Sequence, residues 1–225
     1  MKILIIEDEP DLVYSAVAFL QHEGLVCEYA MNRFEGEDKL LAYHYDVVVL
    51  DISFPDGNGF HLLELIKKNF PETGVLIMSA KNSPEDRTKG LNIGADDYIP
   101  KTVNLTELNA RVKALIRRRK FRGRSEVLFH EIYIDTESQT IRVHGNNMDV
   151  TKKEYDLMLF FMSNPERVLT RESIAEHLWG DDIDMASNYD FLYTHIKNLR
   201  KKILKLGGND YLTTVYGIGY KFSAL

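Results

Sequence analysis

The chain of 225 residues contains little cysteine and no long apolar segment. Cys27 is the only cysteine, so no internal disulfide can form, and a reducing cytoplasm fits best. The longest apolar run, Leu157–Met162, covers six residues, whereas a membrane-spanning helix needs roughly 20. The chain passes from Met1 straight into a strand-like run and then into acids, which is unlike a signal peptide. These absences exclude a disulfide scaffold and predict a cytoplasmic protein without membrane association.

The chain also lacks an overall excess of positive charge, because its formal net charge is −6. The charge is unevenly distributed, however. Residues 187–225 contain six basic and two acidic side chains, a local excess of four positive charges. Local charge rather than the total determines attraction to a polyanion, so the C-terminal part remains a candidate for nucleic-acid binding.

Four strand-like segments of the first half each end in polar side chains. In an open parallel sheet the carboxyl ends of the strands lie together, at the crevice where ligands bind. Three carboxylates, a hydroxyl and an ammonium would meet there, which predicts metal-assisted phosphoryl transfer to an aspartate. The segments and the groups that follow them are Ile3–Ile6 with Glu7 and Asp8, Val47–Leu50 with Asp51, Val75–Met78 with Ser79, and Tyr98–Pro100 with Lys101.

Each of these polar residues also has an ordinary structural explanation. Asp51 alone could cap a helix, Ser79 alone could belong to a turn, and Lys101 alone could be a surface lysine. Their coincidence at four strand ends favours the site. Clustered carboxylates repel one another, and Mg²⁺, which prefers oxygen ligands, would relieve that repulsion. Lys101 could pair with Asp51 first and with a phosphoryl oxygen afterwards.

The chain divides into two halves with different patterns. Residues 1–120 alternate apolar runs with helical patterns, which predicts a compact domain with a five-stranded parallel sheet and helices on both faces. The basic stretch 121–126 is interpreted as a linker. Residues 127–225 contain short antiparallel strands, three helices and a final hairpin, which is the layout of an α+β winged helix-turn-helix domain.

The third helix of the second half, predicted over residues 189–206, is amphipathic. One face is apolar and must pack inward, whereas the other is basic and carries an amide. Such a face suits the major groove of DNA, although a solvated surface helix remains an alternative. The apolar positions are Leu192, Ile196, Leu199, Ile203 and Leu206, and the polar positions are Asp190, Thr194, Lys197, Asn198, Lys201 and Lys205.

The combined motifs resemble the two-component response regulators of the OmpR/PhoB subfamily, with a flavodoxin-like (βα)5 receiver followed by a winged-helix effector. The resemblance covers nearly the whole chain in the family's order. In the first half it rests on Glu7-Asp8, Asp51 with Pro55-Asp56-Gly57, Ser79-Ala80, Gly94–Tyr98 and Lys101. In the second half it rests on Thr170–Glu172, Leu178–Gly180, His195–Lys202 and Thr214–Tyr220.

The resemblance implies a role for each receiver residue. Asp51 would accept a phosphoryl group from a sensor histidine kinase, and Ser79 and Lys101 would bind the phosphoryl oxygens. Ser79 and Tyr98 would then reorient together as a switch. Mg²⁺ would be held by Asp8, by Asp51 and by the backbone carbonyl of Ser53, with Glu7 acting through bound water.

The resemblance also implies partners. Lys89, Asp97, Glu107 and Arg111 match positions that form salt bridges in a phosphorylated homodimer, although each could be ordinary surface charge. The homodimer would bind paired half-sites of double-stranded DNA. The acidic loop 181–184 could face RNA polymerase. The DNA contacts would be Thr194, Lys197, Asn198, Arg200, Lys201 and Tyr216.

The sequence departs from the family at several positions. Thr102 follows Lys101 where proline with a cis peptide bond is usual, and a non-proline cis bond costs about 2.5–4 kcal/mol, which weighs against that geometry without deciding it. Val103 replaces a phenylalanine. Tyr216 stands at the hairpin tip where arginine often reaches the minor groove, and Asp190 stands where a basic phosphate contact is common.

Two other functions remain open. An aspartyl phosphatase would share the acidic pocket but needs a second acid two residues after its nucleophile, and Ser53 occupies that position. We therefore expect phosphoryl acceptance and slow self-dephosphorylation rather than enzymatic turnover. A regulator that binds DNA without phosphorylation is the third possibility. The complete set of Asp8, Asp51, Ser79 and Lys101 argues against it, whereas the missing proline keeps it open.

Overall fold

The structure is a computed structural model that describes residues 1–55, 57–180 and 189–224. The chain divides into two compact units, Met1–Gly123 and Arg124–Leu225. Within the described residues, none of the helices combines the length and apolar character that crossing a bilayer requires. Helix α5 extends through Phe121 and strand β8 begins at Glu126, so the connection between the units is short.

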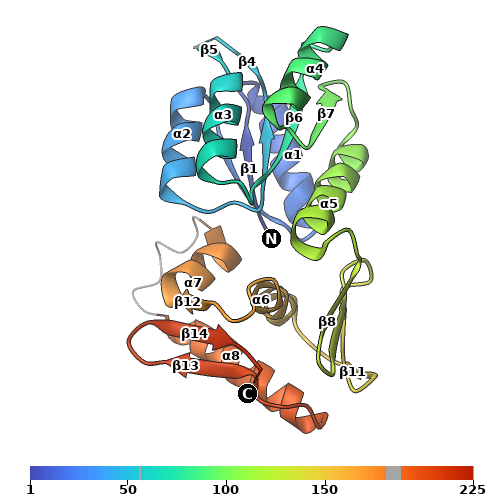
Figure 1. Ribbon diagram of the computed structural model, residues 1–225, viewed down its shortest axis with the longest axis vertical. Helices are drawn as coiled ribbons and strands as arrows, with labels where there is room; N and C mark the ends of the chain where they lie inside the picture. The colour runs from blue at the N-terminus through green and yellow to red at the C-terminus, as the bar shows by residue number, and fades with distance from the viewer. Residues whose placement is uncertain (56, 181–188, 225) are drawn as a thin grey trace. The chain divides into compact units, whose positions relative to one another are not determined.

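The first unit contains the predicted five-stranded parallel sheet, with strand order β2-β1-β3-β6-β7. Helices α1 and α5 cover one face of the sheet, and α2, α3 and α4 cover the other (Figure 1). The strands of the sheet are β1 (Lys2–Ile6), β2 (Val26–Ala30), β3 (Val47–Leu50), β6 (Gly74–Ser79) and β7 (Asp97–Pro100), and β4 (Ser53–Phe54) pairs with β5 (Gly57–Asn58). The helices are α1 (Pro10–His22), α2 (Arg33–Ala42), α3 (Phe60–Asn69), α4 (Pro84–Ile93) and α5 (Leu105–Phe121).

Local signals explain where the receiver helices begin. The side chains of Asn32, Ser83 and Asn104 each accept a hydrogen bond from the backbone three residues later, which caps α2, α4 and α5. The strands are almost entirely buried because the sheet is covered on both faces, so they are continuous apolar runs rather than alternating ones.

A buried ion pair between β1 and β2 was not predicted from the sequence. Lys2 is fully buried, and its Nζ lies 2.8 Å from Glu28 Oε1. The ammonium also lies 4.5 and 4.7 Å from the ring centroids of Tyr43 and Tyr45. The Tyr45 hydroxyl donates to the other Glu28 oxygen, so the charge is enclosed by a carboxylate and two aromatic faces.

The second unit contains the predicted strands, helices and hairpin, and two sheets. One sheet has the order β11-β10-β9-β8 and the other has β12-β14-β13. Helix α6 packs against both α7 and α8 (Figure 1). The strands are β8 (Glu126–Phe129), β9 (Ile132–Asp135), β10 (Thr140–Val143), β11 (Asn146–Met148), β12 (Val168–Thr170), β13 (Leu212–Val215) and β14 (Gly219–Phe222). The helices are α6 (Lys152–Met162), α7 (Arg171–Trp179) and α8 (Asp190–Lys205).

Local signals also define the ends of two helices in this unit. Thr151 and Glu154 form a reciprocal capping box at the start of α6. Thr170 caps α7, and Gly180 ends it with a positive φ of 59°. The predicted inward stripe of α8 is also largely confirmed, because four of its five positions are buried and only Leu206 is half-buried.

Glu131, which precedes β9 of the four-stranded sheet, is hydrogen-bonded to Asn209 and Tyr211 in the segment that follows α8. Its carboxylate accepts hydrogen bonds from the Tyr211 hydroxyl at 2.6 Å and from the Asn209 backbone N–H at 2.7 Å. Burial opposes ionisation, but these bonds outweigh it and lower the pKa of Glu131 from 4.5 to about 2. The ionised form therefore stabilises the fold above pH 4.5, and this stabilisation is lost as the pH falls toward about 2.

We expect Glu131→Gln to lower the free energy of unfolding most near neutral pH, with the difference from wild type shrinking as the pH falls from 4.5 toward about 2. Urea unfolding followed by the fluorescence of the single tryptophan, Trp179, measures this. Exposed Asp149→Asn is the matched control. A difference that stays constant over the whole pH range would show that the charge of Glu131 is not responsible.

Candidate functional site

The sheet topology brings the predicted carboxylates together. Strand order reverses between β1 and β3, which places the ligand crevice at their carboxyl ends. Ile6 lies opposite Leu50, and the Asp51 backbone N–H donates to the Ile6 carbonyl at 2.9 Å. The next residues, Glu7 and Asp8, therefore meet Asp51, and one oxygen from each of the three lies within 4.8 Å of the others.

The Asp51 carboxylate is fully buried and held in one orientation. Its Oδ1 accepts hydrogen bonds from the backbone N–H groups of Ile52, at 2.6 Å, and Ser53, at 3.0 Å. Its Oδ2 lies 2.9 Å from Lys101 Nζ, although this approach lacks hydrogen-bond geometry. One oxygen is thus fixed by the backbone, and the other faces the charged groups of the site.

Lys101 pairs with Asp51 as predicted, and also with two further acids. Its Nζ lies 2.7 Å from both Glu7 Oε1 and Glu9 Oε1. Burial disfavours the ammonium, but the hydrogen bonds to these acids outweigh it and raise the pKa of Lys101 above its usual range. Lys101 therefore remains a cation. Glu9 was missed by the sequence reasoning, although it directly follows the acidic pair that drew attention to this strand end.

The donor set suits a hard divalent cation. Glu7 is fully buried, and desolvation raises the pKa of its carboxyl to about 7 despite the hydrogen bond from Lys101. Its Oε2 has no hydrogen-bond partner among the described residues. Mg²⁺ prefers oxygen ligands such as carboxylates. Here the carboxylates lie close to one another, some of their buried oxygens accept no hydrogen bond, and Lys101 supplies only one positive charge. The residues present thus fit the expected ion.

The two hydroxyls of the site are hydrogen-bonded to each other. Ser53 Oγ and Ser79 Oγ lie 3.1 Å apart, and the Lys81 backbone N–H donates to Ser79 Oγ at 3.3 Å. The ring of Tyr98 is buried, and its hydroxyl donates to the Lys81 carbonyl. Lys81 therefore links the predicted switch pair Ser79 and Tyr98. Desolvation raises the pKa of Tyr98, so the hydroxyl remains protonated as a donor at neutral pH.

The loop that carries Asp51 closes tightly onto helix α3. A Cβ on Gly59 would lie 2.3 Å from the Asp51 carbonyl oxygen and 2.8 Å from Ile52 Cα. Both are backbone atoms that cannot move without displacing the loop. Gly59 is thus needed for the position of Asp51.

The Lys101–Thr102 peptide bond is trans, like every peptide bond among the described residues.

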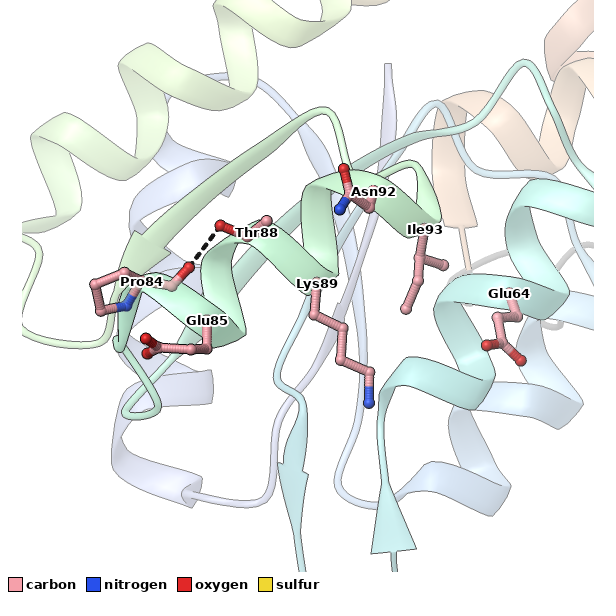
Figure 2. Close-up of a pocket in the computed structure, with 7 residues that line it drawn as sticks. All are labelled: Glu64, Pro84, Glu85, Thr88, Lys89, Asn92 and Ile93. Carbon is pink, nitrogen blue, oxygen red and sulfur yellow. Dashed lines mark hydrogen bonds between the residues drawn. The ribbon is translucent and has the colours of Figure 1, made fainter.

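Three of the four residues predicted at a dimer interface cluster within one protomer. Arg111 Nη1 lies 2.8 Å from Asp97 Oδ2, and Arg111 Nη2 lies 2.8 Å from Glu107 Oε1. Lys89 does not join them. Its side chain points from α4 into the groove beside α3, which is lined by Glu64 among others (Figure 2), and its Nζ lies 4.4 Å from the centre of the Phe60 ring. The predicted role of Lys89 concerns contacts with a second copy, so it stays a prediction.

The polar face of α8 is exposed as predicted, whereas Arg200, predicted separately as a DNA contact, is half-buried. Lys197, Asn198 and Lys201 are exposed, and so is Thr194. Arg200 instead turns toward the hairpin, where its Nε donates to the Leu212 carbonyl at 3.1 Å and to Asp210 Oδ1 at 3.2 Å. Its guanidinium thus joins α8 to β13. The predicted contact of Arg200 with DNA stays a prediction.

The hairpin tip places Tyr216 in solvent, with 93% of its surface exposed. The acidic loop 181–184, predicted to face RNA polymerase, lies outside the described residues.

Each of the two units matches a known protein family. Residues 3–113 match the model of the response regulator receiver domain, and residues 145–222 match the C-terminal domain of transcriptional regulatory proteins. Response regulator ArlR of Staphylococcus haemolyticus is 34% identical over 97% of this chain and 98% of its own. Transcriptional regulatory protein PmrA of Pectobacterium parmentieri is 36% identical over 98% of this chain and 96% of its own.

A solved structure supports the fold of the first unit. The crystal structure of a response regulator receiver domain protein from Methanospirillum hungatei is 31% identical, with a TM-score of 0.52. The match covers 54% of this chain and 98% of that one. The chain belongs to the OmpR/PhoB-type family of two-component response regulators, with a receiver domain and a DNA-binding effector domain that act in the regulation of transcription.

Proposed function

We propose that the protein is a phosphorylation-controlled transcription factor whose receiver accepts a phosphoryl group on Asp51 from a sensor histidine kinase. The observation that carries this proposal is the Asp51 carboxylate, which is buried, oriented by two backbone N–H groups and paired with Lys101. A carboxylate oxygen forms the new P–O bond while the phosphorus–nitrogen bond to the kinase histidine breaks.

Mg²⁺ would be held by Asp8 and Asp51, with the Ser53 carbonyl, and by Glu7 through water. When bound, the ion would neutralise charge on the transferring phosphoryl group. Lys101 would exchange a carboxylate partner for a phosphoryl oxygen, and the Ser79 hydroxyl would donate to another. These residues supply cations and donors where negative charge accumulates, which is the main need of phosphoryl transfer.

The transferred group would remain on the protein long enough to act as a signal. Ser53 stands two residues after Asp51, where an aspartyl phosphatase carries a general acid. Without that acid, we propose slow self-dephosphorylation rather than turnover of phosphate esters.

Phosphorylation would control dimerisation and DNA binding. If Ser79 turns toward the phosphoryl group, it leaves Ser53 and Lys81, and the contact of Lys81 with Tyr98 changes with it. The altered face would pair with a second copy through Lys89, Asp97, Glu107 and Arg111. Two effectors would then bind paired half-sites in the cytoplasm and act on RNA polymerase, since joining two DNA-binding units raises their combined affinity.

The full-length protein incubated with Mg²⁺ and acetyl phosphate should gain one phosphoryl group and shift toward a dimer. Intact mass spectrometry measures the first change, and size-exclusion chromatography with light scattering of the same sample measures the second. Samples without phosphodonor and samples with chelator are the controls. A dimer that forms equally in all samples would contradict phosphorylation control of assembly.

A further inference from the structure

Two serine hydroxyls meet beside Asp51 from different segments of the receiver. Ser53 lies in β4, two residues after Asp51, and Ser79 is the last residue of β6. Their Oγ atoms are hydrogen-bonded at 3.1 Å. The Ser53 backbone is held independently of this bond, because its N–H donates to Asp51 Oδ1 at 3.0 Å and the residue pairs with Asn58 on β5. Ser53 therefore meets Ser79 from a position that the loop carrying Asp51 sets.

The surroundings of Ser79 indicate which of the two hydroxyls donates. Ser79 is fully buried, whereas Ser53 is half-buried. The Lys81 backbone N–H already donates to Ser79 Oγ at 3.3 Å. A serine hydroxyl has a single proton, and a buried proton that lacks an acceptor costs free energy. The Ser79 hydroxyl therefore donates to Ser53 Oγ.

Phosphorylation requires the same proton. Under the proposed function, the Ser79 hydroxyl donates to an oxygen of the phosphoryl group on Asp51. One proton cannot serve both acceptors, so the hydrogen bond to Ser53 must break before Ser79 can bind the phosphoryl group. The bond thus stabilises only the resting orientation of Ser79, and it acts on the equilibrium between the resting and the turned orientation.

We propose that Ser53 is a positioning residue whose hydroxyl holds Ser79 in its resting orientation, and so limits how readily the protein reacts and dimerises. This inference rests on the proposed function and adds the group that opposes the switch. Lys81 extends the effect to Tyr98, because its N–H donates to Ser79 and its carbonyl accepts from the Tyr98 hydroxyl. The hydroxyl acts separately from the predicted Mg²⁺ ligand of this residue, which is the backbone carbonyl.

The equilibrium predicts two linked effects when the Ser53 hydroxyl is removed. One hydrogen bond of this kind shifts an equilibrium about fivefold. While the turned orientation is the minor one, the rate of phosphorylation follows its population and rises about fivefold. A dimer needs two turned protomers, so its dissociation constant falls by the square of that factor, about 25-fold. A residue that acted only on the chemistry of transfer would change the first quantity alone.

The test compares the full-length wild type with Ser53→Ala, Ser53→Thr and, as a matched control, Ser15→Ala at an exposed position of α1. Intact mass spectrometry over time measures phosphorylation by acetyl phosphate with Mg²⁺. Sedimentation equilibrium in chelator, without phosphodonor, measures the dimer dissociation constant. We expect Ser53→Ala to react about fivefold faster and to dimerise about 25-fold more tightly. Ser53→Thr, which keeps the hydroxyl, and Ser15→Ala should match the wild type.

Two results would overturn the proposal. The first is a Ser53→Ala protein with the dimer dissociation constant of the wild type, whatever its rate of phosphorylation, because Ser53 would then act on the transfer alone or not at all. The second is an equal effect in Ser53→Thr, which would assign the change to packing. A wild type that gains no phosphoryl group would instead refute the proposed function. The dimer measurement, which uses no phosphodonor, would still decide the role of Ser53.

Discussion

Asp51→Asn should abolish the gain of a phosphoryl group from acetyl phosphate and, with it, the shift to a dimer. The amide is nearly the same size as the carboxylate, and its oxygen can still accept the backbone hydrogen bonds that Asp51 takes from Ile52 and Ser53. The fold should therefore persist. The amide nevertheless lacks the negative charge that attacks phosphorus and binds a cation. Intact mass should show no adduct where the wild type shows one phosphoryl group.

The matched control is Asp38→Asn, the same substitution at an exposed position of α2. This variant should be phosphorylated to the same extent as the wild type. A phosphoryl group found on Asp51→Asn, located by peptide mapping at another residue, would transfer the acceptor role to that residue. Loss of phosphorylation in the control would instead show that the assay reports general damage to the receiver.

Gly219→Ala should unfold the effector domain or destabilise it by about 3 kcal/mol. Gly219 pairs with Thr170 on β12 and with Val215 on β13, so it lies within the sheet. An added Cβ would lie 2.0 Å from the Leu169 carbonyl oxygen and 2.9 Å from Thr170 Cα. Because both obstacles are backbone atoms, β12 must separate from β14 to make room. The cost is therefore larger than that of a displaced side chain.

Urea unfolding followed by Trp179 fluorescence measures the loss, since the single tryptophan lies in the effector. Phosphorylation of the receiver should continue, whereas binding to double-stranded DNA should be lost together with the fold. Thr213→Ala, at an exposed position of β13, should change the unfolding free energy by less than about 1 kcal/mol. An unfolding curve of Gly219→Ala that superimposes on the wild type would show that β12 and β14 separate at little cost.

The amino-acid sequence was sufficient for the features that depend on neighbours along the chain. Apolar runs of strand length predicted β1, β3, β6 and β7, and the polar residues that follow them predicted the site. The spacing of apolar residues predicted the inward stripe of α8. Strand β2 was less evident because Glu28 interrupts it, and that buried acid pairs with Lys2 from β1 and accepts a hydrogen bond from Tyr45. Short strands such as β12 have too few residues for a recognisable alternation.

The sequence by itself determined the order of elements, the carboxylate cluster and the amphipathic pattern of helix α8, because periodicity and the ends of strands are local properties. Only the tertiary structure decided how each charged side chain is used. Arg200 and Lys197 lie on one helix, yet Arg200 binds the Leu212 carbonyl while Lys197 remains exposed. Lys89 lies over Phe60, Arg111 binds Asp97, and Lys101 binds Glu9 as well as Asp51. The physical reason is that a long cation reaches several acceptors, and the acceptors within reach come from segments distant in the chain.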